Sequence, residues 1–185
     1  MVAVKQGFRT YVLGMLVAMV ACASNASESE AYVSAGVAIF DVSSFSAANL
    51  FETDDVSIYG AYLSSGGSVN DWVELEVKIG KGINKEEDVA DIELDYFFGV
   101  SVRVTPLGAS HAVKPYIVLG TVKSKFEACF SGECAKLDES NFSYGIGSTF
   151  KFGRKIGLTA EYLRVKDLGN DGANVISASL DYFFD

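Results

Sequence analysis

Alternating apolar and polar positions are clearest at the end of the chain, over residues 176–184. Every second residue from Ile176 to Phe184 is apolar, and the residues between them are mostly polar. Successive side chains of a β-strand point to opposite faces, so this period of two predicts a strand with one apolar and one mostly polar face. The same rhythm recurs along the chain. It predicts eight strands, at 31–40, 55–64, 71–80, 91–104, 114–125, 140–152, 156–166 and 174–184.

The segment 91–104 carries the longest of these patterns. It is apolar at seven alternate positions, from Ile92 to Val104, whereas strands of globular proteins usually have about 5–6 residues. A soluble β-sandwich would also alternate, with its charged face in water. Alternation by itself therefore leaves a sandwich and a membrane-spanning barrel open, and the length of this segment favours the barrel.

Two further features favour a barrel in an outer membrane. Connections alternate between short turns, as at 64–70 and 153–155, and longer acidic segments, which is the pattern of periplasmic turns and external loops. Aromatic residues gather near strand ends, as in the girdles at the two membrane interfaces. They are Phe40, Tyr62, Tyr116, Phe142, Phe150, Phe152, Tyr182 and Phe184. We therefore expect an all-β fold, an eight-stranded antiparallel up-and-down transmembrane β-barrel.

In such a barrel the apolar face of each strand touches lipid and the polar face lines the interior. We expect Val77 and Leu94 to face lipid. For 55–64 the pattern leaves open whether Ile58 and Tyr62 or Tyr59 and Leu63 face lipid. Nine charged residues are expected inside: Glu74, Glu76, Lys78, Glu93, Asp95, Arg103, Lys151, Glu161 and Asp181. The excess of acids predicts that some carboxyl groups are protonated or hydrated, and that any ion path prefers cations.

The first 26 residues have the features of a cleaved secretory signal. Lys5 and Arg9 precede a short apolar run at 11–21, and small residues follow it. That run is shorter than the roughly 20 residues that a membrane-spanning helix needs. We favour cleavage after Ala26, while cleavage after Ala23 and lipid attachment at Cys22 stay open. Residues 27–185 then form a single domain, the barrel.

The formal net charge of the chain is −9, and removing the two basic residues of the signal changes it to −11. Binding of nucleic acid depends on patches of Lys and Arg that neutralise phosphates. The acidic balance therefore argues against nucleic acid as a partner and suits an exported surface.

Several short motifs resemble one known family. The stretch 114–120, Lys-Pro-Tyr-Ile-Val-Leu-Gly, resembles the Pro-Tyr-x-x-x-Gly opening of a strand in the small outer-membrane β-barrel proteins, which include the opacity-type proteins and the barrel of outer-membrane protein A. The stretch 144–147, Tyr-Gly-Ile-Gly, resembles the following strand, and the closing segment resembles the terminal assembly signal, although Asp185 follows the usual final Phe. The resemblance implies an outer-membrane location, contact with outer-membrane lipid and lipopolysaccharide, and recognition of the last strand by the barrel-assembly machinery.

Two of the three cysteines, Cys129 and Cys134, lie in the expected connection between the fifth and sixth strands. An exported chain meets an oxidising compartment, and Gly132 between the two cysteines permits a tight reversal. We predict a disulfide that stiffens an external loop. Zinc is disfavoured, because two thiolates without a nearby His or second Cys pair supply too few ligands.

The sequence offers no catalytic constellation and implies no cofactor. His111 is the only histidine and lies beside Ser110 in an expected turn, whereas nucleophilic catalysis needs Ser, His and an orienting acid together. Acidic residues of the expected external loops predict solvated loops, since they lack the spacing of a twelve-residue calcium loop. These acids are Asp41, Glu52, Asp54, Glu86, Glu87, Asp88, Glu127, Glu133, Asp138, Glu139, Asp167 and Asp171.

The number of strands limits the width of the barrel interior and therefore the functions that the barrel can have. Eight strands enclose an interior just wide enough for side chains, whereas a bulk-flow channel needs about sixteen. The sequence therefore predicts an outer-membrane protein that serves envelope structure or surface interaction through its acidic loops, with an extracellular partner left open. The alternative is a porin-like channel for small solutes or ions, with a preference for cations.

Overall fold

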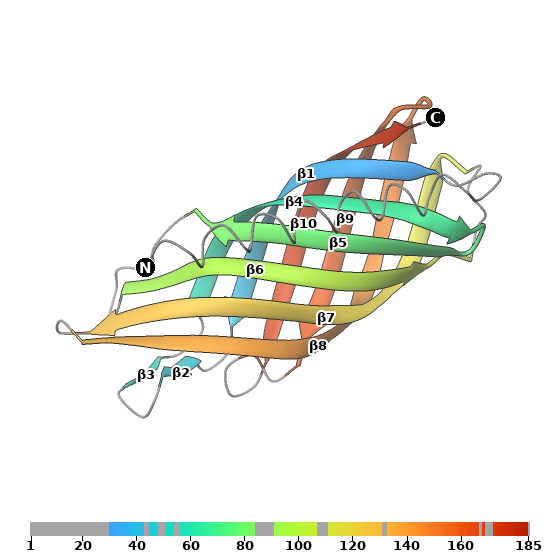
Figure 1. The fold of residues 1–185 in the computed structure, drawn as a ribbon. Helices are drawn as coiled ribbons and strands as arrows, with labels where there is room; N and C mark the ends of the chain where they lie inside the picture. Colours follow the sequence, from blue (N-terminus) through green and yellow to red (C-terminus); the bar gives the residue numbers. More distant parts are fainter. Residues whose placement is uncertain are drawn as a thin grey trace, which may run out of the picture.

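The computed structural model describes residues 30–42, 45–47, 51–53, 56–83, 91–106, 111–130, 133–166, 168 and 172–184. Eight strands form a closed antiparallel barrel, and two short strands form a separate hairpin (Figure 1). The barrel strands are β1 (Ala31–Val42), β4 (Val56–Asn70), β5 (Val73–Gly82), β6 (Asp91–Val104), β7 (Val113–Phe130), β8 (Glu133–Phe152), β9 (Ile156–Val165) and β10 (Ala173–Phe184); the hairpin strands are β2 (Phe45–Ala47) and β3 (Phe51–Thr53). Within the described residues, no helix has the length and apolar character to cross a membrane.

Each barrel strand pairs with its neighbours in sequence, and the last strand closes the sheet on the first. β1 pairs with β4 on one side and with β10 on the other, and the register with β10 runs from Ala31 opposite Phe184 to Val42 opposite Ala173. Closure leaves no open edge along this part of the sheet. The eight-stranded antiparallel barrel that the alternation predicts is confirmed.

The two ends of the barrel differ. At one end, here called the short-turn end, the strands are joined by turns at Asp71–Trp72 and at Gly153–Lys155, and β10 also finishes there. The side-chain oxygen of Asn70 accepts hydrogen bonds from the backbone N–H groups of Trp72 and Val73, at 2.9 and 3.0 Å, which closes the first of these turns. Gly153 has a φ of 82°, a conformation that favours glycine in the second turn.

The segment 64–70 is part of β4 and is not the turn that its glycines and serines predict. Its small residues have a packing role instead. A Cβ added to Gly66 would lie 2.5 Å from the hydroxyl of Tyr32, which is its direct partner on β1. Small residues therefore leave room for a large aromatic side chain inside the barrel.

At the opposite end, here called the long-loop end, β7 and β8 reach beyond the other strands (Figure 1). Their pairing continues to Phe130 opposite Glu133, so the residues expected to form a long loop are strand residues. Cross-strand ion pairs on this hairpin join Lys123 to Asp138 at 3.0 Å and Lys136 to Glu127 at 3.1 Å. β9 pairs with β8 only from Ser143 to Phe152. Residues 133–141 of β8 thus have a ladder partner on one side only among the described strands.

The outer surface carries large apolar side chains around the whole barrel. Five of the eight predicted girdle aromatics lie there, with exposed fractions of 40–65%: Phe142, Phe150, Phe152, Tyr182 and Phe184. Tyr59, Trp72, Tyr144 and Tyr162 join them. The prediction is wrong for the other three, because Phe40, Tyr62 and Tyr116 occupy inward positions and are at most 5% exposed.

Alternate burial and exposure along β4 also show which of its faces points inward. Tyr59 and Leu63 lie on the outer face, at 45% and 63% exposure, while Ile58 and Tyr62 are buried inside. The buried face of β4 meets aromatic rings that β1 and β6 also direct into the lumen. Tyr62 packs against Phe97 with a ring-centroid separation of 6.3 Å.

A β-bulge in β6 overturns three of the expected orientations. The register with β7 shifts between Leu94 and Tyr96, so Asp95 is an extra residue. The inward and outward faces of β6 therefore exchange at this point of the strand. Leu94 is fully buried inside and does not touch lipid. Glu93 and Asp95 are not interior residues: they pair with Lys81 at 3.9 Å and with Lys125 at 3.3 Å, and the side chain of Lys81 is 67% exposed.

Val77 provides a test of the lipid-facing register. It lies at the middle of the outward positions of β5, opposite Val100, which is 41% exposed. We expect Val77→Arg to cost about 2–4 kcal/mol of folding free energy, because an arginine near the middle of the bilayer must be desolvated. Urea unfolding of the protein refolded in lipid vesicles measures this, with Val77→Leu as the control. Equal stability of the two variants would contradict a lipid-facing position of Val77.

The register of the β7–β8 hairpin sharpens the disulfide prediction. Cys129 and Cys134 are direct cross-strand partners rather than loop residues. Directly opposed residues have Cα atoms about 4.5–5.5 Å apart, within the roughly 4.4–6.8 Å that disulfides span. We predict a bridge that adds about 2 kcal/mol, the chain-entropy estimate for so short a loop. Mass measurement after alkylation without reductant should find neither thiol labelled; two labelled thiols would refute the bridge.

Candidate functional site in the barrel interior

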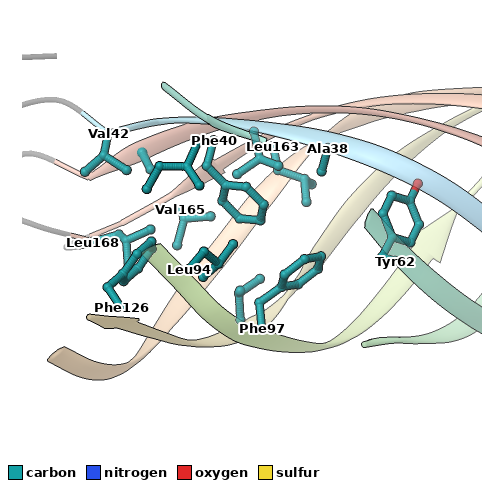
Figure 2. Close-up of a cluster of buried hydrophobic side chains, with 14 of the residues drawn as sticks. Ala38, Phe40, Val42, Tyr62, Leu94, Phe97, Phe126, Leu163, Val165 and Leu168 are labelled. Atoms are coloured by element: carbon teal, nitrogen blue, oxygen red, sulfur yellow. The ribbon is translucent and has the colours of Figure 1, made fainter. Parts of the chain in front are cut away.

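The interior of the barrel has two layers of opposite character. The layer toward the long-loop end, here called the apolar plug, consists of Ala38, Phe40, Val42, Ile58, Tyr62, Leu94, Phe97, Val122, Phe126, Leu163, Val165, Leu168, Ala173 and Val175, and the same buried cluster continues to Val118 and Tyr116 beside the polar layer. Figure 2 shows Phe40 and Phe97 pointing toward each other across the lumen, and their ring centroids lie 5.0 Å apart in an edge-to-face arrangement. Sequence reasoning missed this layer, because it assigned the interior to polar positions alone.

Side chains fill the lumen at the level of the plug. A cavity of about 30 Å³ remains where the plug meets the polar layer, lined by Phe40, Tyr62 and Phe97 together with Lys78. A single water molecule needs roughly 10–15 Å³ on this measure. The space therefore suits two or three water molecules.

Four charged side chains form the centre of the polar layer, here called the central charge cluster: Glu76, Lys78, Arg103 and Glu161. Arg103 lies between the two acids, 2.7 Å from a carboxylate oxygen of Glu76 and 3.2 Å from one of Glu161. Lys78 pairs with Glu76 at 3.2 Å and also with Glu161. The strands β5, β6 and β9 supply these residues at inward positions, so segments far apart in sequence meet inside one narrow lumen.

Aromatic and hydroxyl groups complete the cluster. Tyr32 donates a hydrogen bond to Glu76 at 3.0 Å and accepts one from Arg103 at 2.7 Å, while Tyr116 donates to Glu161 at 3.0 Å. The Arg103 guanidinium also lies 4.6 Å from the centre of the Tyr116 ring, a cation–π distance. Buried charges persist when they are paired and hydrogen-bonded. Each charge of this cluster of two acids and two bases has a partner of opposite sign, while Oε1 of Glu76 and Nε of Arg103 make no hydrogen bond.

A second charged group, here called the rim cluster, lies nearer the short-turn end. Lys114 pairs with Glu74 at 2.5 Å and with Glu30 at 3.8 Å, and Glu30 also pairs with Lys151. Lys151 lies 4.7 Å from the centre of the Phe183 ring. The rim cluster again balances two acids with two bases.

Asp181 on β10 is buried, with 3% exposure, and hydroxyl groups surround it. Its carboxylate accepts hydrogen bonds from Thr159 at 2.5 Å and from Ser179 at 2.9 Å. Thr149 lies 2.7 Å from Thr159 and extends the chain of hydroxyls to β8.

Of the nine charged residues expected inside, the structure places seven at inward positions: Glu74, Glu76, Lys78, Arg103, Lys151, Glu161 and Asp181. Sequence reasoning missed Lys114 and Glu30. Lys114 has the same parity as the buried Tyr116 and Val118, which is the signal that could have found it. Glu30 precedes the first strand, so no alternation identifies it.

The described residues hold no group of three or more His, Cys, Asp or Glu side chains placed to bind a metal ion. His111 is exposed beside the turn that precedes β7, and Ser110 lies outside the described residues. Of the acids expected in external loops, Asp41 accepts a hydrogen bond from Ser57 at 2.6 Å and Glu139 accepts one from Asn141 at 3.1 Å. Asp54, Glu86, Glu87, Asp88, Asp167 and Asp171 lie outside the described residues.

Comparison with protein families now places this barrel. Residues 12–184 match the model of the outer membrane protein beta-barrel domain. The chain belongs to this family. It is therefore an outer-membrane β-barrel protein, as the short motifs and the alternation predict. The comparison with curated protein sequences finds no match.

Solved structures of other outer-membrane proteins share the fold. Neisserial surface protein A is similar at a TM-score of 0.61 and 19% identity, over 83% of this chain and 97% of that one. The attachment invasion locus protein of Yersinia pestis, crystallised with the heparin analogue sucrose octasulfate, is similar at a TM-score of 0.62 and 18% identity, over 85% and 99%. The N-terminal barrel of OprF from Pseudomonas aeruginosa has a TM-score of 0.56 at 16% identity, over 82% and 97%.

Family membership assigns the two ends of the barrel. Barrels of the outer membrane have short periplasmic turns and longer external loops, so the short-turn end faces the periplasm and the long-loop end faces outward. The apolar plug then closes the external half of the lumen. The central charge cluster lies on its periplasmic side.

Removing one member of the central charge cluster tests its contribution to stability. We expect Arg103→Ala to lower the free energy of unfolding by about 3–5 kcal/mol, because it leaves Glu76 and Glu161 buried with less compensation. Lys123→Ala is the matched control, since its partner Asp138 is half exposed and such pairs contribute about 0–1 kcal/mol. Urea unfolding measures both. Equal losses in the two variants would contradict a structural role for the cluster.

Proposed function

We propose that this protein serves envelope structure and surface interaction through its external end, and that it neither catalyses a reaction nor conducts solutes. The observation that carries this proposal is the apolar plug, which fills the external half of the lumen and leaves a cavity of about 30 Å³. An eight-stranded barrel has room inside only for side chains. With the lumen filled, function rests on the surfaces that the barrel displays.

The porin-like alternative is disfavoured on the same ground. A cation path would need to cross from the rim cluster through the central charge cluster to the long-loop end. Beyond Lys78 it meets Phe40, Phe97 and Leu94, which are at most 4% exposed. Charges cannot enter such an apolar layer without a large desolvation cost.

At the long-loop end, one side of β8 offers main-chain groups to which a partner can bind. The main-chain carbonyl of Phe142 accepts a hydrogen bond from Lys166 on the side of β9. The N–H and C=O groups of one strand residue point the same way, and alternate residues share that direction. Ser140, Asp138 and Lys136 therefore direct main-chain groups to the side of β8 that has no ladder partner there among the described strands. An extended segment of a partner can add to such an edge, and the acids Asp138 and Glu139 favour a cationic one.

Partners at the membrane follow from the outer face. Outer-membrane lipid and lipopolysaccharide would contact the belt of exposed apolar side chains. The barrel-assembly machinery would meet the last strand, where Tyr182 and Phe184 pack edge to face at 5.3 Å on the outer surface. A sulfated glycan of the kind crystallised with the Yersinia protein suits this chain less well, because its expected external loops are acidic.

Conductance in planar bilayers tests the proposal. We expect the refolded protein to show no steady current, because the plug blocks the lumen. Phe97→Ala should produce brief cation-selective openings by enlarging the cavity that Phe97 lines. Phe142→Ala removes an aromatic ring of the same size from the outer face and serves as the control. A large, steady current through the unaltered protein would overturn the proposal in favour of a channel.

A further inference from the structure

Asp181 differs from the other interior acids that the structure describes between the plug and the short-turn end. Glu30, Glu74, Glu76 and Glu161 each pair with a Lys or Arg within 4.0 Å. Asp181 is as deeply buried as the central cluster, yet its partners in the structure are hydroxyl groups. An isolated buried carboxylate costs several kcal/mol, so such a group needs a compensating positive charge.

The balance of charges in the lumen also indicates that Asp181 needs a compensating positive charge. The central charge cluster and the rim cluster each contain two acids and two bases, so each is neutral as a unit. Asp181 is therefore the one negative charge in excess among the described interior residues on the periplasmic side of the plug. One monovalent cation would make this part of the lumen neutral.

The groups around Asp181 are all oxygens. Thr159 and Ser179 each donate their single hydroxyl proton to the carboxylate, which leaves lone pairs on Ser179 and, beside the hydrogen bond that Thr159 shares with Thr149, one on Thr159. Ser34 on β1 is the direct register partner of Asp181 and is 5% exposed, and its hydroxyl has no hydrogen-bond partner. Directly opposed residues on one face have Cβ atoms about 4.5–5.5 Å apart. The orphan hydroxyl thus belongs to the residue directly opposite Asp181 on the inner face.

We propose that Asp181, Ser34, Thr159 and Ser179 form a binding site for a small monovalent cation, sodium, inside the barrel. Hard cations take carboxylate and hydroxyl oxygens as ligands. A single carboxylate matches a single positive charge, whereas a calcium ion, which takes about 6–8 oxygens, would leave an uncompensated charge. The ion supplies Ser34 with the partner that it lacks and joins β1 to β9 and β10 at the seam where the barrel closes.

Sodium-dependent stability tests the site. The refolded protein in detergent micelles is heated in about 0.15 M sodium chloride or in N-methyl-D-glucamine chloride of equal ionic strength, and the folded band is followed on a gel. We expect the unfolding temperature to be about 3 °C higher in sodium, the shift for a sodium concentration about fivefold above Kd. Asp181→Asn should abolish the difference, and Ser34→Ala should move it to higher sodium concentrations.

Asp138→Asn is the matched control, because it removes an acid that has its own lysine on the exposed β7–β8 hairpin, leaves the charge of the lumen unchanged and should keep the sodium effect. Broadening of the sodium-23 resonance by the folded protein gives a second readout that needs no variant to fold. Equal unfolding temperatures in the two salts, with no broadening, would overturn the proposal and leave Asp181 protonated or hydrated. A sodium effect that survives in Asp181→Asn would place the ion elsewhere and overturn it equally.

Discussion

Closure of eight strands into a barrel is the constraint on which the rest of the structure depends. It leaves a lumen only as wide as the side chains that fill it, and it sends every second residue of each strand into that lumen. Lipid outside accepts only apolar side chains, so polar groups that the chain carries on its strands must find partners inside or beyond the membrane. The charged layers and the apolar plug are two ways of filling one narrow space.

The parity of each strand, and hence most of the interior, follows from alternation alone. Glu76, Arg103 and Glu161 could be placed inside from their sequence neighbours, because lipid-facing apolar residues flank them on the same strands. The bulge at Asp95 could not be predicted in this way. A single extra residue exchanges the faces of β6, and nothing in the local pattern of 91–97 distinguishes an apolar side chain in the plug from one in lipid.

Apolar side chains can face either lipid or the lumen, and for this reason alternation also failed to predict the plug and the inward position of three aromatic residues. Phe40, Tyr62 and Tyr116 are aromatic, like the residues of a membrane girdle, yet they lie on the strand faces that point inward. Apolar character identifies residues that avoid water and does not tell lipid from a packed lumen. The pairing of each strand with its neighbours in the closed barrel decides the matter, as for Phe40 on β1, which pairs with β4 and β10, and for Tyr116 on β7, which pairs with β6 and β8. Ion partners such as Glu30 and Lys114 depend on the same long-range closure.

Glycines make the charged layer sterically possible. Gly66 is the register partner of Tyr32 and Gly147 that of Tyr116, and a Cβ at Gly147 would lie 2.4 Å from the Tyr116 ring. Each ring thus occupies the space that its partner leaves empty, and each brings a hydroxyl to the central charge cluster. The short Tyr-Gly-Ile-Gly stretch, which resembles a strand of the family, is in this chain part of the support for a buried arginine. Replacing either glycine would displace a tyrosine, and Glu76 or Glu161 would then lose a hydrogen bond in a place that water does not reach.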